Sequence, residues 1–117
     1  MRNKLINRKT TQLILVHFTG SKETDYRQIK SKSLQEGIVE IGYHYLIEED
    51  GKLLMGRHQS KVGFHYPEFD AVSIGIGIAA ERDDMTEEQS IALTLLLDKL
   101  RNDYPSVEKI KYIYRAP

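Results

Sequence analysis

Short apolar runs separated by polar turns set the pattern along this chain. Residues 13–18 form a largely aliphatic run, which is typical of a strand buried on both faces. Residues 41–47 and 52–55 predict two more strands, and Asp50-Gly51 between them is a strong hairpin turn. The first half of the chain therefore predicts a buried strand and a β-hairpin.

Isoleucine and glycine alternate in a later apolar segment, residues 72–80, which predicts a further strand. Its glycines, Gly75 and Gly77, leave room for another backbone or a helix to approach closely. Residues 109–114 predict a short final strand. The stretch at residues 56–66 is rich in histidine and glycine and is expected to form a loop or an irregular strand.

Two segments predict helices. Residues 24–36 carry apolar side chains at roughly helical spacing among charged ones, and a glycine follows as a stop. In the second segment, Thr86 is followed three residues later by Gln89, which is the spacing of an N-terminal capping box. This helix is expected to end near residue 102, because Pro105 cannot continue it.

The order strand, helix, hairpin, strand, helix, strand predicts an α/β fold in which helices flank a mixed central β-sheet. The length suits one compact domain. We therefore expect residues 1–117 to form a single domain, with a basic N-terminal extension at residues 1–11.

Charge and composition exclude several classes of function. Acidic and basic residues balance at 17 each, so no net field would attract nucleic acid or an anionic membrane. The chain has no cysteine, which excludes disulfides and cysteine ligands to a metal. It shows neither a secretory signal nor the roughly 20 apolar residues of a membrane span. We expect a cytoplasmic protein, or one released on lysis.

The four histidines are the first candidates for metal chemistry, although none of them pairs at the i, i+4 spacing of a helical zinc site. In one interpretation His17 ends a strand with a local hydrogen bond, and His44 lies in a polar pocket that satisfies it. His58 and His65 are then solvated loop residues. In the other interpretation His65 approaches His17 across a groove and, with Asp70 or a glutamate, gives an irregular ligand set.

Several short motifs follow one another along the chain and are more specific together than singly. They are Val16-His17-Phe18-Thr19, Gly42-Tyr43-His44-Tyr45-Leu46-Ile47, Asp50-Gly51, Gly56-Arg57, Val62-Gly63-Phe64-His65 and Ser73-Ile74-Gly75-Ile76. In this order the motifs resemble the signature of the type 2 N-acetylmuramoyl-L-alanine amidases. That superfamily includes phage lysozymes of the amidase type and animal peptidoglycan recognition proteins. The resemblance covers about residues 12–116 and implies the amidase type 2 fold.

The resemblance implies a zinc enzyme that cuts the amide bond between N-acetylmuramic acid and L-alanine of the peptidoglycan stem. In such enzymes two histidines and a cysteine or aspartate hold the zinc, and water takes the fourth position. By this likeness His17 is the first zinc ligand, and Tyr43 is the catalytic tyrosine that assists the water or the tetrahedral intermediate. His65 matches a residue at the rim of the substrate groove. Asp70 stands where the family often has an asparagine. By this likeness, His65 and Asp70 are both expected to bind substrate.

The chain departs from the family pattern in three places. Tyr114 stands where the second zinc histidine is expected, and a phenol with a pKa of about 10 is a poor substitute for imidazole at neutral pH. The third ligand and a neighbouring lysine are expected further along than Pro117. Lys32-Ser33 replaces a Trp-His pair that lines the groove in many relatives.

These features leave two hypotheses open, and with them whether the chain is an enzyme. In the first, an incomplete zinc site leaves a non-catalytic relative that binds a peptidoglycan fragment or a protein partner, because an open zinc site needs three protein ligands. In the second, the chain is an active zinc amidase whose C-terminal ligand segment is absent from this sequence. We favour the first hypothesis, because the sequence shows only one of the three ligands. Retention of both His17 and Tyr43 supports the second hypothesis, unless the two residues only hydrogen-bond each other across neighbouring strands. Zinc is expected as the cofactor only in the second case.

Overall fold

The computed structural model describes residues 5–35, 41–81 and 84–114. The strands are β1 (Leu13–Phe18), β2 (Tyr45–Ile47), β3 (Leu53–Met55), β4 (Ser73–Ile78) and β5 (Lys109–Tyr114). The helices are α1 (Tyr26–Gln35) and α2 (Glu87–Asp103), and a short 3-10 helix spans Asp70–Val72. The glycine stop expected after the first helix lies outside the described residues.

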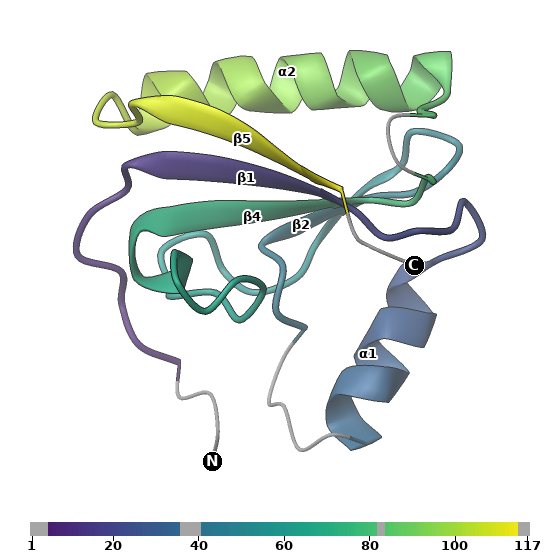
Figure 1. Cartoon of the computed structure of the whole chain (residues 1–117), viewed down its shortest axis with the longest axis horizontal. Helices are drawn as coiled ribbons and strands as arrows, with labels where there is room; N and C mark the ends of the chain where they lie inside the picture. Colours follow the sequence, from purple (N-terminus) through teal and green to yellow (C-terminus); the bar gives the residue numbers. More distant parts are fainter. Residues whose placement is uncertain (1–4, 36–40, 82–83, 115–117) are drawn as a thin grey trace.

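The strands form one sheet in the order β3-β2-β4-β1-β5. All neighbouring pairs are parallel except β2 and β3, which form an antiparallel hairpin at one edge. Gly51 in the hairpin turn has a φ of 86°, a conformation that glycine adopts without strain. Helix α2 lies along one face of the sheet and α1 lies on the other side (Figure 1). The expected α/β fold with a mixed sheet and flanking helices is confirmed.

The hydrophobic core lies between α2 and the sheet. Alternate residues of the central strands face α2, as the two-residue period of a strand requires. The core contains Ile14, Val16, Phe18, Ile74, Ile76 and Ile78 from β1 and β4, and Leu93, Leu96 and Leu100 from α2. The intervening positions of β1 and β4, which include His17 and Gly75, are turned to the opposite face of the sheet.

The start of α2 is fixed by the predicted capping box. The Thr86 hydroxyl accepts a hydrogen bond from the backbone N–H of Gln89, and the Gln89 side chain accepts one from the backbone N–H of Thr86. The buried Gln89 amide also donates to the Ala79 carbonyl at 2.9 Å, which ties the helix to the chain just after β4. Among the described residues, neither helix is long and apolar enough to cross a membrane.

Strand β2 is shorter than the sequence predicts, since it begins at Tyr45 rather than at residue 41. The backbone N–H of Gly75, which lies just before the β2–β4 ladder, donates to His44 Nδ1 at 2.9 Å. The His44 side chain therefore accepts the hydrogen bond from Gly75 that a backbone carbonyl of a longer β2 would otherwise accept. At Gly42 the backbone lies so close to the Phe64 carbonyl that a Cβ would collide with it.

The glycines of β4 accommodate aromatic rings, so the expectation that another backbone or a helix packs there is wrong. A Cβ on Gly75 would lie 2.6 Å from the His65 ring, and one on Gly77 would lie 3.1 Å from the Tyr43 ring. The two glycines thus let two side chains with candidate chemical roles rest directly on the sheet.

Residues near the N-terminus support the loop that leads to His65. Arg8 donates from its backbone N–H to the Ser60 carbonyl at 2.8 Å. Its guanidinium donates to the carbonyls of Gln59 at 2.6 Å and Lys61 at 3.0 Å. These contacts hold residues 59–61 against the segment that contains Arg8.

Candidate active site

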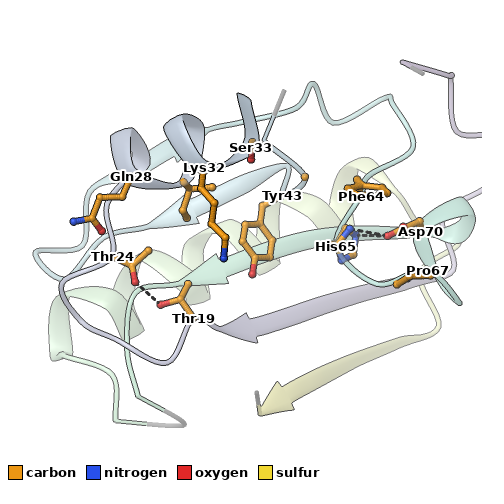
Figure 2. Close-up of a pocket in the computed structure, with 12 residues that line it drawn as sticks. Thr19, Thr24, Gln28, Lys32, Ser33, Tyr43, Phe64, His65, Pro67 and Asp70 are labelled. Atoms are coloured by element: carbon orange, nitrogen blue, oxygen red, sulfur yellow. Dashed lines mark hydrogen bonds and ion pairs between the residues drawn. The ribbon is translucent and has the colours of Figure 1, made fainter. Parts of the chain in front are cut away.

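A cavity of about 470 Å³ opens between α1 and the face of the sheet that is turned away from α2. Tyr43, His65 and Asp70 line the cavity from the sheet side, and Lys32 and Ser33 line it from α1. Figure 2 shows the residues that line this cavity, among them Lys32 and Tyr43. Three of the four site residues predicted from sequence therefore share one cavity.

His17 lies beneath this cavity and is 3% exposed. Its Nε2 atom is 2.9 Å from Nδ1 of His65, and its ring centroid is 5.5 Å from that of Tyr43. The expected approach of His65 to His17 is confirmed. We call His17, Tyr43 and His65 the aromatic triad.

His17 lies on β1 and Tyr43 lies just before β2, and these two strands are not neighbours, contrary to the expectation for His17 and Tyr43. Strand β4 lies between β1 and β2, and Gly77 of β4 pairs with His17 in register. The Tyr43 ring also lies over Gly77. Because Gly77 has no side chain, the rings of His17 and Tyr43 meet above the intervening strand. The sequence signal for this contact is the Gly-Ile-Gly alternation itself.

Asp70 shapes the cavity by holding the backbone around His65. Its Oδ1 atom accepts hydrogen bonds from the backbone N–H groups of His65 at 3.0 Å and Tyr66 at 2.8 Å. Nε2 of His65 lies 3.6 Å from the same oxygen and 3.4 Å from the hydroxyl of Ser73. Ser73 is buried at the start of β4 and was not among the site residues predicted from the sequence.

The His65 side chain is buried, so its interpretation as a solvated loop residue is wrong. Its side chain is 1% exposed. Burial, followed by the neighbouring His17, lowers the pKa of His65 to about 2. The imidazole is therefore neutral at physiological pH, and its contact with Asp70 is not an ion pair.

His44 lies in a polar pocket that satisfies it, as expected. It is fully buried, its Nε2 lies 2.7 Å from the Lys61 carbonyl, and its Nδ1 accepts from Gly75. The expectation that it faces away from Tyr43 is wrong, because its ring centroid is 5.9 Å from that of His65 in the same site. Residues before Tyr45 do not form a regular strand, so the alternation of faces does not apply to them.

We expect the protein to lose stability in mild acid because of His44. Burial lowers the pKa of His44 from 6.5 to about 4, although the bond to Lys61 opposes this shift. Between these two values the unfolded chain binds a proton that the folded chain does not. The contribution of His44 to stability is therefore fully present above pH 6.5 and decreases as the pH falls towards 4, by about 2 kcal/mol between pH 7 and pH 5. His65, whose pKa is lowered further, adds a loss of similar size over the same range.

Urea unfolding at the two pH values measures this loss. The exposed His58 provides the control, because its Nδ1 contacts only Ser60 nearby. A His58→Ala variant should show the same loss as the unmodified chain. Equal stability at pH 7 and pH 5 would contradict the buried, neutral state of His44.

Tyr114 does not occupy the place of a zinc ligand. It pairs in register with Phe18 and stacks on that ring, with centroids 5.3 Å apart. Phe18 belongs to the core beneath α2, so Tyr114 lies on the opposite face of the sheet from His17. The expectation that Tyr114 takes the place of the second zinc histidine is wrong. The motif match gave its position along the strand but not the face towards which its side chain points.

His17 fits the part of a zinc ligand, because its imidazole is buried and its Nε2 is hydrogen-bonded to a second group. Within residues 5–35, 41–81 and 84–114, no three His, Cys, Asp or Glu side chains lie close enough together to hold a metal ion. Among the described residues, His17 therefore stays a candidate ligand without the further ligands of such a site.

Comparison with known proteins shows what this chain resembles. The family model for N-acetylmuramoyl-L-alanine amidase matches residues 7–115. The endolysin of Enterobacteria phage K11 is 32% identical in an alignment of 108 positions, which covers 84% of this chain and 72% of that protein.

Two solved structures extend the comparison. The structure of N-acetylmuramoyl-L-alanine amidase LysC from Clostridium intestinale URNW matches with a TM-score of 0.83 and 28% identity, over 93% of this chain and 74% of that one. Bumblebee PGRP-SA, at 19% identity and a TM-score of 0.81 over 93% of this chain and 74% of its own, shares the fold.

Proposed function

The chain belongs to the N-acetylmuramoyl-L-alanine amidase family, and from this premise we propose that it is a peptidoglycan amidase of the phage endolysin type. Its substrate is the amide bond between N-acetylmuramic acid and L-alanine. The observation that carries the proposal is the aromatic triad beside the cavity: His17 and Tyr43, the residues matched to a ligand and a catalytic group, have ring centroids 5.5 Å apart. As an endolysin, it would accumulate in the cytoplasm and reach the cell wall on lysis.

Zinc would activate water and polarise the amide carbonyl when bound. The described residues complete no such site, so we assign them binding and positioning roles. His17 is the candidate ligand, and Tyr43 lines the cavity, where its hydroxyl can donate to the oxygen of the reacting amide. Asp70 holds the chain that carries His65, and Lys32 adds a positive charge at the cavity wall. Asp70 and His65 shape the place where the stem peptide binds.

The non-catalytic hypothesis, in which the chain only binds a peptidoglycan fragment or a protein partner, has less support. Of the similar proteins, the one from phage K11 is named as an endolysin and LysC is named as an N-acetylmuramoyl-L-alanine amidase. Both names are those of enzymes. The likeness to PGRP-SA shows the fold alone.

Digestion of purified peptidoglycan tests the proposal. The chain, supplied with zinc, should release new amino termini of L-alanine without new reducing sugar ends, and a zinc chelator should stop the release. Labelling of amino termini and a reducing-sugar assay measure the two products separately. If the chain sediments with peptidoglycan but releases no L-alanine termini, the enzymatic proposal is wrong and the binding hypothesis replaces it.

A further inference from the structure

The imidazole of His65 is confined to one orientation. A Cβ on Gly63 or on Gly75 would lie 2.6 Å from its ring, so the ring packs directly against both glycines, which together form a cradle for it. Its backbone N–H donates to Asp70 at 3.0 Å, and the side chain is 1% exposed. Confinement of this kind is typical of a group that orients another, because a buried ring has little direct access to substrate.

The two nitrogens of the His65 ring face different partners. Nδ1 is 2.9 Å from Nε2 of His17, whereas Nε2 is 3.6 Å from a carboxylate oxygen of Asp70 and 3.4 Å from the Ser73 hydroxyl. A carboxylate only accepts hydrogen bonds, so it favours the proton on Nε2 of His65. Nδ1 of His65 then carries a lone pair and accepts from His17.

The direction of this bond determines the tautomer of His17. If His17 donates from Nε2, its own lone pair is on Nδ1. Metal-ligating histidines in general donate their second ring N–H to an acceptor, which fixes the ring and selects the nitrogen that binds the metal. Here the acceptor is a second imidazole.

We propose that His65 is a positioning residue that holds His17 in the Nε2–H tautomer and so presents Nδ1 of His17 as the metal-binding atom. The role of His17 as a ligand rests on the proposed function, whereas its tautomer is a property of the metal-free chain. Asp70 and Ser73 orient His65, and the cradle of Gly63 and Gly75 keeps its ring in contact with His17.

Nitrogen NMR of the imidazole rings in the metal-free full chain reads the tautomer directly. The unmodified chain should show His17 with its proton on Nε2. His65→Asn should retain this state, because the asparagine amide oxygen can lie near the place of Nδ1 and accept. In His65→Ala the His17 ring should become a mixture of tautomers, and in Gly75→Ala the displaced His65 ring should give the same mixture.

Zinc titration of the same proteins is the second readout. His65→Ala should weaken the binding of zinc alone about 10- to 100-fold, and His65→Asn should recover much of the loss. His58→Ala is the control and should bind as the unmodified chain does, with thermal unfolding to confirm that each variant is folded.

The proposal is overturned if the unmodified chain carries the His17 proton on Nδ1, or if His65→Ala leaves the tautomer unchanged. If His65→Ala does not fold, the tautomer of His17 in Gly75→Ala and in His65→Asn tests the proposal instead. A chain that shows the expected tautomer yet neither binds zinc nor cleaves peptidoglycan refutes the proposed function and leaves the positioning role of His65 in place.

Discussion

Replacement of His17 by alanine is expected to lower the release of L-alanine termini from peptidoglycan by at least about 100-fold. Loss of residues that merely support a metal ligand costs roughly 10- to 100-fold, so loss of the candidate ligand itself should cost at least as much. His17 also contacts both other members of the triad, with its Nε2 2.9 Å from Nδ1 of His65. Initial rates at saturating zinc measure the effect.

His58→Ala is the matched control for this loss. His58 is an exposed loop histidine, so its removal should leave the rate within about twofold of the unmodified chain. Circular dichroism should show that both variants retain the fold. Full activity in His17→Ala would contradict the assignment of His17 and would require another residue to provide the first ligand.

Leu100→Ala is expected to lower the free energy of unfolding by about 2–5 kcal/mol. Leu100 is fully buried in the core between α2 and the sheet, and truncation of a buried leucine removes apolar contacts and leaves a cavity. Because the core is on the opposite face of the sheet from the triad, activity of the folded fraction should change little. Urea unfolding at pH 7 measures the change.

Leu95 of the same helix provides the control. It is 66% exposed, so Leu95→Ala should change the free energy of unfolding by about 0.5 kcal/mol or less. Both substitutions alter the helical propensity of leucine equally. The difference between Leu100→Ala and Leu95→Ala therefore measures the packing of α2 on the sheet. Equal effects of the two substitutions would show that α2 does not pack as described.

Local features of the fold could be predicted because their causes lie within a few residues. The apolar run at residues 13–18 is β1, and the capping box at Thr86 begins α2. The turn at Gly51 closes the β2–β3 hairpin. In each case the backbone geometry is dictated by side chains that are adjacent in sequence. The motif order also led to the amidase family, which the family model confirms.

The site could be predicted only in part. The motifs selected His17, Tyr43, His65 and Asp70, and the last three line one cavity. Their catalytic and substrate-binding roles stay predictions. Tyr114 was misplaced because the face of a strand depends on its register with Phe18 in a different segment of the chain.

By itself, the sequence determined the strands, the helices and the residue types available for chemistry, including an apparent zinc ligand at His17. Only the tertiary structure decided what His17 touches. Its hydrogen-bond partner His65 is 48 residues away, and the strand between His17 and Tyr43 comes later in the chain than either residue. Such contacts are set by the order and register of parallel strands and by glycines that admit a ring. The Gly-Ile-Gly alternation shows that a ring can lie on β4, but local periodicity does not show which ring lies there or which strands are neighbours.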